Sequence, residues 1–193
     1  MIKKSVISDI DCAIKEIWKR QIKRDYNDIF LIREDALKCS MYYHLRKKLS
    51  PLIKEHNLRI LPEFHIPSLN KFADLAVVEM DFDRDCYYFK DYISDIIAII
   101  ELKFTNGGDI NTTEWIRNDI RKMKQYLQEG HLDCQYYFAC IYEEECEWLQ
   151  WMDKRSTNNW ANGYVTELNA GFIDGNMTFE VHSYNGMNKD LND

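Results

Sequence analysis

Two apolar segments that carry charge decide the fold, Phe72-Ala-Asp-Leu-Ala-Val-Val-Glu-Met80 and Ile96-Ile-Ala-Ile-Ile-Glu-Leu-Lys-Phe104. The first contains two valines, the second contains four isoleucines, and each contains a phenylalanine, which predicts buried strands. Successive side chains on a strand point to opposite faces, so Glu101 and Lys103 share one face of the second strand. Together with Asp74 on the first strand, they are expected to act on one bound object.

Carboxylates brought close together in a half-buried setting repel each other and lose hydration. A nearby cation removes this penalty, and without one a pKa rises. Mg²⁺ is the ion expected here because it favours oxygen ligands, with Mn²⁺ as its alternative. The Glu-x-Lys triplet alone is a weak pattern, and Asp74 in the preceding strand is what makes it a predicted metal site.

These residues resemble the PD-(D/E)xK nuclease superfamily, whose members have the restriction-endonuclease-like fold. In that pattern an acidic residue on one strand precedes Glu-x-Lys on the next, and here Asp74 precedes Glu101 to Lys103. The chain differs from the pattern in two ways. Ala73 stands where a proline often precedes the acidic residue, and the long connection 81–95 separates the two strands.

The resemblance implies a Mg²⁺-dependent nuclease, with DNA favoured over RNA and an endonuclease favoured among the activities. Asp74 and Glu101 would ligate the metal, and Lys103 would hold the attacking water or stabilise developing charge. Glu34 and Glu63 would add carboxylates to the metal shell. The alternative is a catalytically silent module of the same fold that binds a protein or nucleic acid. The acidity of the chain favours that alternative, and the intact motif favours the enzyme.

Glu34 and Glu63 also have structural interpretations. Helical periodicity places Glu34 on the same stripe as Leu37 and Met41, while Asp35 faces solvent. Glu34 therefore reaches the site, or it is a first-turn carboxylate that stabilises the helix N-terminus. Glu63 either supplies a further carboxylate or forms a structural ion pair.

A helix from Thr113 to Gly130 is expected after a turn at Gly107-Gly108. Asp119, Lys122 and Tyr126 form a polar stripe beside its apolar face. In the resembled nucleases this helix lines the site, so Lys122 would contact a phosphate and Tyr126 would orient it. The alternative is an exposed ion pair of Asp119 with Lys122 and a half-buried tyrosine.

The expected architecture is a single α/β (α+β) domain over residues 1–193, a three-layer sandwich with a mixed four- to five-stranded sheet between helices. Its core covers about residues 30–142, followed by a helix and hairpin over 143–185 and a polar tail over 186–193. The expected helices are Ser8 to Arg24, with Ser8 as N-cap, Ile32 to Leu49, 113–130 and Glu143 to Trp160. The expected strands are Leu58 to Ile66, 72–80, 96–104, Cys134 to Tyr142, a short one in Cys86 to Lys90, and a hairpin over 164–184. The first three long strands suit an antiparallel meander, and the crossover helix makes the fourth strand parallel.

The composition limits the partners. The net charge is -7, with 25 Lys and Arg against 32 Asp and Glu, which weighs against binding to a nucleic-acid backbone. A local basic patch can still bind on an acidic protein. Two candidate clusters, each otherwise a solvated helix face, are Arg46, Lys47, Lys48, Lys54 and Arg59, and Arg117, Arg121, Lys122 and Lys124.

Other chemistries have little support. The six cysteines form no Cys-x-x-Cys pair, which favours reduced thiols over a zinc site or disulfides. No apolar run is long enough to span a membrane or to act as a signal peptide, so a cytoplasmic protein is expected. The expected partner is nucleic acid, with a homodimer or a protein partner as alternatives and no membrane.

Overall fold

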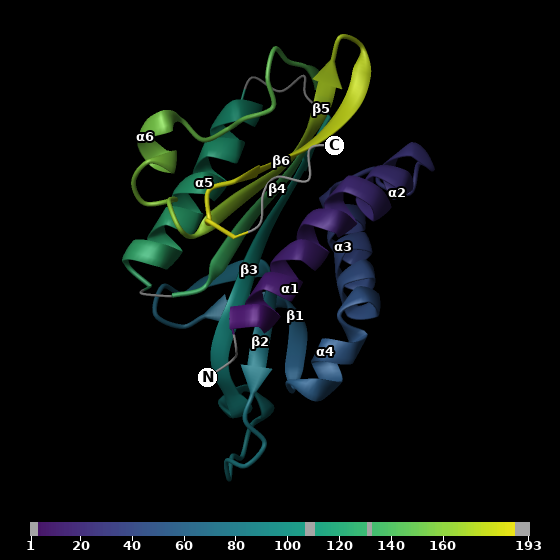
Figure 1. Cartoon of the computed structure of the whole chain (residues 1–193). Coiled ribbons are helices and arrows are strands. Elements are labelled where there is room, and N and C mark those ends of the chain that lie inside the picture. The colour runs from purple at the N-terminus through teal and green to yellow at the C-terminus, as the bar shows by residue number, and fades with distance from the viewer. Residues whose placement is uncertain (1–3, 107–110, 131–132, 188–193) are drawn as a thin grey trace.

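The computed structural model describes residues 4–106, 111–130 and 133–187. In these residues six strands form one mixed sheet in the order β1 to β6 (Figure 1). The strands are β1 (Leu58–Ile66), β2 (Lys71–Met80), β3 (Ile93–Thr105), β4 (Gln135–Glu145), β5 (Val165–Ile173) and β6 (Asn176–Ser183). The β1/β2, β2/β3 and β5/β6 pairs are antiparallel, and β3/β4 and β4/β5 are parallel. The predicted meander and the parallel fourth strand are confirmed.

The strand number was predicted too low. The C-terminal hairpin joins the sheet because β5 pairs with β4 along most of its length, from Val165 to Phe172. The sheet therefore has six strands, not four to five.

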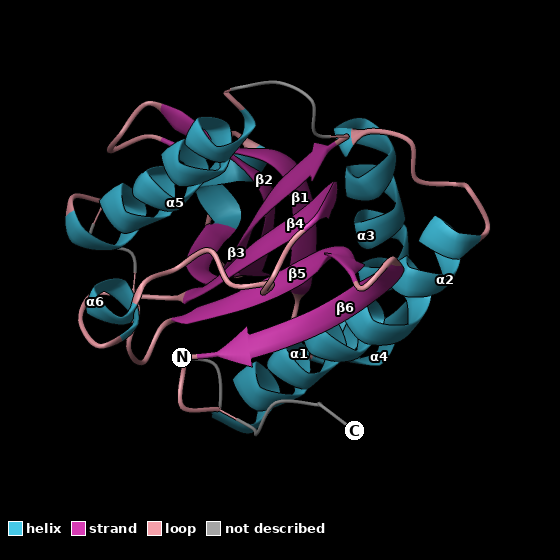
Figure 2. Ribbon diagram, turned by 90° about the horizontal axis from the view of Figure 1, so that it is seen from above, coloured by secondary structure: helices cyan, strands magenta, loops and turns pink. Residues whose placement is uncertain are grey.

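Helices cover both faces of this sheet (Figure 2). On one face lie α1 (Lys4–Glu16), the π-helical segment η1 (Ile17–Ile22), α2 (Lys23–Asn27), α3 (Glu34–Lys48) and α4 (Ser50–Glu55). On the other lie α5 (Thr112–Gln128) and the short α6 (Lys154–Thr157). A 3₁₀ turn, η2 (Phe89–Tyr92), precedes β3.

Each face of the sheet buries its own core. Trp18 of η1 and Leu37 of α3 pack with Ile100 on one face, and Ile116 of α5 packs with Ile99 on the other. Alternate residues of β3 enter opposite cores, so its central run must be apolar throughout. The prediction that this segment is a buried strand is confirmed, since residues 97–100 are at most 4% exposed.

Two predicted local features were wrong, one in the first helix and one in the connection between β2 and β3. Ser8 is not an N-cap, because the first helix begins four residues earlier and Val6 extends its buried stripe. The segment Cys86 to Lys90 is not a strand. It lies in a projecting connection that Arg84 closes by hydrogen bonds to Asp81 and to the backbone of Ile93.

The predicted helix over 143–160 was also wrong, and α6 is its only helical turn. The start of this segment forms a strand and not a helix, because Glu145 pairs with Phe172 across a bulge. Farther on, the buried Glu167 carboxylate accepts the backbone N–H groups of Trp151 and Met152, which fixes a non-helical path.

Some predicted features lie outside the described residues, namely the Gly107-Gly108 turn and residues 188–193 of the tail. Asn185, the residue before the predicted tail, is buried and donates to Asp11 at 2.8 Å. All six cysteines are free thiols. In the described part of the chain, no helix has the length and apolar character needed to cross a membrane.

Candidate active-site cleft

The site forms where β2 and β3 part. The pairing between them ends at Leu75 and Ile100. Beyond this pair, the start of β2 pairs only with β1, and the end of β3 pairs only with β4. Asp74 immediately precedes Leu75, on the side where the two strands have separated, and its Oδ2 accepts a hydrogen bond from the Leu102 N–H at 2.8 Å. The side chain thus replaces a ladder bond, which fixes the Asp74 carboxylate beside Glu101.

Glu101 is a buried carboxylate, 1% exposed. Lys122 Nζ of α5 donates to its Oε2 at 2.7 Å, whereas Oε1 has no hydrogen-bond partner among the described residues. Burial raises the pKa of Glu101 to about 8; the Lys122 ammonium opposes this, and the charge of Asp74 adds to it. Glu101 therefore mostly keeps a proton at neutral pH unless another cation approaches it.

Lys103 joins three elements at the cleft. Its Nζ lies 3.0 Å from Glu34 Oε2 at the start of α3 and 3.2 Å from Asp119 Oδ2 on α5. Burial alone would lower the pKa of Lys103, but Asp119 and Glu34 outweigh it and raise the pKa. For the Asp119 carboxyl, burial raises the pKa, and the Lys103 ammonium opposes this effect. The ammonium therefore stays charged at the point where the three elements meet.

Lys38 was not predicted as a site residue. Its Nζ lies 2.7 Å from Asp74 Oδ1 and also bonds the Glu63 carboxylate. Burial opposes its charge, but the bonds to Asp74 and Glu63 prevail and raise the pKa of Lys38. Helical periodicity could have identified Lys38, because a residue four positions after Glu34 lies about 40° from it around the helix.

Glu63 has a strained backbone, with a φ of 48° in the left-handed region inside a strand. For a residue other than glycine this conformation costs about 1 kcal/mol or more, and such strain often accompanies functional sites. Glu63 occupies the position between the pairs Pro62–Leu75 and Phe64–Ala73, opposite Asp74.

An open cleft of about 780 Å³ is lined by Glu34, Lys38, Glu63, Asp74, Asp119 and Lys122, whereas Glu101 and Lys103 are not among its lining residues. Its charged walls hold four acidic and four basic side chains: Glu34, Glu63, Asp74 and Asp119, and Lys38, Lys71, Arg121 and Lys122. The cleft is therefore balanced in charge, although the chain as a whole carries -7.

Of the three residues predicted on the helix after Glu-x-Lys, Asp119 and Lys122 lie at the cleft surface and Tyr126 is buried. Asp119 and Lys122 line the cleft, and each binds a charged residue of β3 in place of the alternative exposed pair. Tyr126 is fully buried, and its hydroxyl donates to the Phe72 carbonyl at 3.0 Å. Tyr126 therefore supports the cleft wall, and Lys122 Nζ lies over its ring, 5.8 Å from the centroid.

Asp74 and Glu101 have the character of a divalent-cation site. They are neighbouring carboxylates, and the buried Oε1 of Glu101 is without a partner in the described structure. Within residues 4–106, 111–130 and 133–187, no group of three His, Cys, Asp or Glu side chains is arranged to hold an ion. Here Lys38 Nζ lies 2.7 Å from Asp74 Oδ1, and Lys122 Nζ donates to Glu101 Oε2 at 2.7 Å. The donor set fits a hard cation that displaces these ammonium groups.

Comparisons of the chain with protein-family models, with curated proteins and with solved structures found no match. The chemistry of the cleft has to be argued from its own residues.

Proposed function

We propose that this protein is a Mg²⁺-dependent nuclease that hydrolyses phosphodiester bonds, most simply a DNA endonuclease. The observation that carries the proposal is the convergence of Asp74, Glu101 and Lys103 at the point where β2 and β3 part. Asp74 is fixed there by the Leu102 N–H, and Lys103 lies on the same face as Glu101. The restriction-endonuclease-like fold is part of this proposal, and the mixed sheet covered on both faces is compatible with it.

Asp74 and Glu101 would hold the cation. Mg²⁺ bound there would supply a Lewis acid that lowers the pKa of an attacking water and neutralises charge on the phosphate. Mn²⁺ would serve as an alternative ion.

The remaining charged side chains position the substrate. Lys103 would stabilise the negative charge that develops on the phosphate, because its ammonium stays protonated beside Glu34 and Asp119. Lys122 and Arg121 on the cleft wall would contact neighbouring phosphates. Glu34 and Asp119 would keep Lys103 in place.

The test combines metal binding with cleavage. Asp74→Asn keeps an acceptor for the Leu102 N–H but removes the charge, and Lys103→Gln removes the ammonium. We expect Mg²⁺ binding to be lost in the first variant by calorimetry, and cleavage of plasmid or oligonucleotide to fall about a hundredfold or more in both. Asp35→Asn, an exposed change on the same helix as Glu34, is the matched control. Undiminished cleavage in either site variant would show that the chemistry lies elsewhere.

A second candidate function is the catalytically silent module that binds a protein or nucleic acid. The contacts of Lys38 with Asp74 and of Lys122 with Glu101 favour it, because they give both carboxyl groups a partner without a metal. Under this proposal the wild-type protein would bind no Mg²⁺ and cut nothing, and Lys103→Gln would alter stability alone.

A further inference from the structure

An aromatic pair stands at the rim of the cleft. Phe72, two residues before Asp74 on β2, lines the cleft with 51% of its surface exposed. His65 lies opposite it on β1, with the ring centroids 4.8 Å apart and the planes tilted by 42°. The backbone under the pair is held in place, because the Phe72 carbonyl accepts the Tyr126 hydroxyl and Ala73 is buried. A rigid support presents an aromatic face to solvent beside the candidate site.

A cation stands next to this aromatic pair. Lys71 precedes Phe72 and lines the same cleft. Its ammonium bonds the side-chain oxygen of Gln125, and in the described part of the chain it makes no ion pair with a carboxylate. The other two lysines that line the cleft already have acidic partners, Lys38 with Asp74 and Glu63 and Lys122 with Glu101. Lys71 can therefore take a phosphate without breaking an ion pair, one residue away from an exposed ring.

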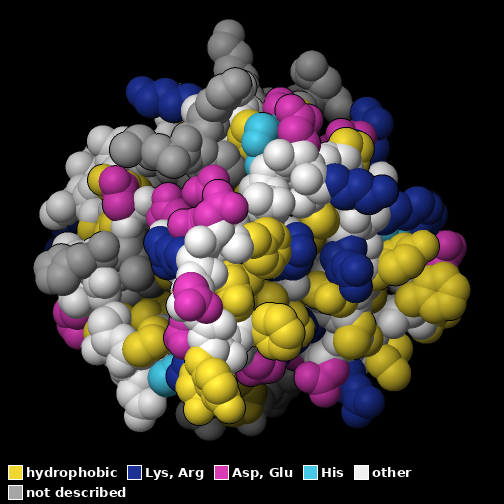
Figure 3. Space-filling model, turned by 90° about the horizontal axis from the view of Figure 1, so that it is seen from below, with side chains coloured by type: hydrophobic (Ala, Val, Ile, Leu, Met, Phe, Trp, Pro, Cys, Tyr) yellow, Lys and Arg dark blue, Asp and Glu magenta, His cyan; other side chains and the backbone are white. Residues whose placement is uncertain are grey.

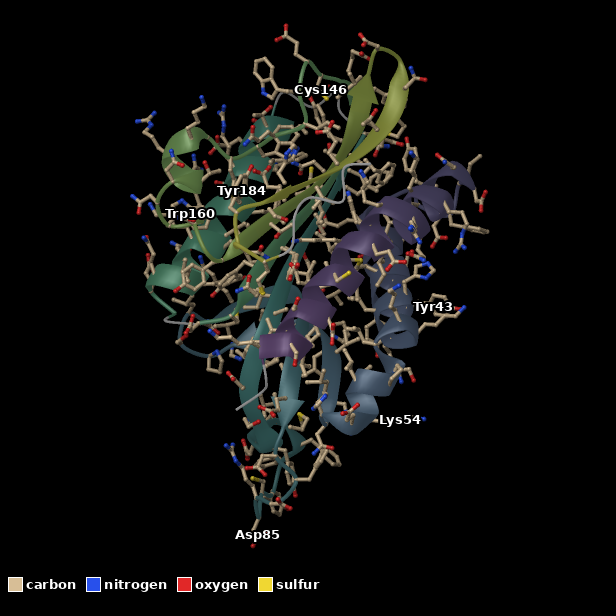
Figure 4. The ribbon with its side chains drawn as sticks, viewed as in Figure 1. Tyr43, Lys54, Asp85, Cys146, Trp160 and Tyr184 are labelled. Atoms are coloured by element: carbon tan, nitrogen blue, oxygen red, sulfur yellow. The ribbon has the colours of Figure 1, made fainter. Side chains whose placement is uncertain are left out.

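A second hollow continues from this rim. It has a volume of about 780 Å³ and shares Glu63 with the cleft. Beyond His65 its walls are mainly apolar and include Phe64, Met80, Ile96 and the exposed Phe89. Figure 3 looks onto the end where the β2–β3 connection projects, with Asp85 at its tip in Figure 4, and shows hydrophobic side chains beside Lys and Arg. Such walls suit the faces of bases better than phosphates.

We propose that Phe72 and His65 form a stacking subsite for an unpaired nucleobase, and that the substrate of the cleft is a single strand or an unpaired end. This inference rests on the proposed function. In a duplex the bases are stacked on each other and cannot reach an exposed ring, whereas in a single strand each base offers a free face. Lys71 holds the adjacent phosphate, and the apolar groove receives the next base.

The experiment compares the binding of two nucleic-acid probes. Ca²⁺ replaces Mg²⁺ in the buffer so that neither probe is cleaved. One is a fluorescent single-stranded 12-mer with a central 2-aminopurine, and the other is its duplex. Phe72→Leu removes the ring but keeps an apolar side chain. Tyr43→Leu is the matched control, because Tyr43 is 58% exposed on α3 and points away from the sheet in Figure 4.

We expect Phe72→Leu to weaken single-strand binding about tenfold or more by anisotropy, and to remove the 2-aminopurine quenching seen with wild type. Duplex binding and the Tyr43→Leu variant should match wild type. Wild-type preference for the duplex, or single-strand binding that is unchanged in Phe72→Leu, overturns the subsite and leaves the nuclease proposal standing. If wild type binds neither probe, the proposed function fails as well. A dimer that dissociates in Phe72→Leu without loss of strand binding would assign this surface to a second copy and overturn the proposal.

Discussion

Glu101→Gln should make the metal-free protein more stable, by an amount that grows with pH. The Glu101 carboxyl is buried, and only its Oε2 accepts the Lys122 ammonium. Glutamine has almost the same shape, and its amide oxygen can accept the same hydrogen bond. The substitution therefore removes a titrating group without opening a cavity.

The magnitude follows from the pKa of Glu101, about 8 in the folded protein against an ordinary value of 4.5. The folded state holds this proton more tightly than the unfolded chain. The stability that the proton provides is fully present below pH 4.5 and is lost as the pH rises towards 8. At about 1.4 kcal/mol per pH unit, wild type loses about 3 kcal/mol by pH 7 and about 5 kcal/mol by pH 9. The glutamine variant has no such loss.

The measurement is urea unfolding in EDTA at pH 5, 7 and 9, followed by circular dichroism. Glu129→Gln, the same chemical change at an exposed position, controls for the loss of one surface charge. The stability difference between Glu101→Gln and wild type should be small at pH 5 and about 3 kcal/mol at pH 7. Added Mg²⁺ should stabilise wild type at pH 9 and leave Glu101→Gln unchanged, because only the carboxylate attracts the ion.

Parallel stability curves for the two proteins from pH 5 to pH 9 would refute this reasoning. They would mean that the carboxyl titrates normally in the folded state, through solvent access or through a stronger effect of Lys122 than the geometry indicates.

Three further changes test the charges and the packing. Lys38→Met should tighten Mg²⁺ binding several-fold in calorimetry, because the ammonium that competes for Asp74 is removed; an unchanged affinity would contradict the competition. Asp11→Ala should lower the free energy of unfolding by about 3–5 kcal/mol, since it strands the buried Lys15 ammonium, and a loss below about 1 kcal/mol in urea titration would contradict this. Gly171→Ala should cost about 1–3 kcal/mol, because its Cβ would come within 2.7 Å of a leucine methyl; an unchanged thermal midpoint would show that the neighbour relaxes freely.

The parts of the fold predicted from sequence are those determined by local pattern. Residues 58–66, 72–80 and 96–104 are strands, as their β-rich composition and length indicate, and α3 has the predicted apolar stripe. Charge inside an apolar strand was the signal that indicated Glu101 and Lys103, and each of them meets a charged partner from a helix. Burying charge is costly without a partner, so such residues mark places where the fold brings partners together.

The partners themselves could not be predicted, because they come from distant parts of the chain. Lys38 on α3 forms an ion pair with Asp74 on β2, and no local sequence pattern specifies which strand a helical lysine faces. Glu167 is fully buried on β5 and accepts backbone groups of the segment expected to be a helix. Its sequence neighbours give no sign of that role. Tertiary contacts override helix propensity there, as is common for short segments.

The balance of charge in the cleft connects its stability with its proposed chemistry. Four basic and four acidic groups line it, so the acidity of the chain is carried by other surfaces. The lysines limit the repulsion between carboxylates when no metal is bound, as the opposing effect of Lys122 on the pKa of Glu101 indicates. Under the nuclease proposal, a cation that binds Asp74 and Glu101 releases Lys38 and Lys122, whose ammonium groups then face the phosphate. The same side chains would stabilise the empty cleft and bind the substrate.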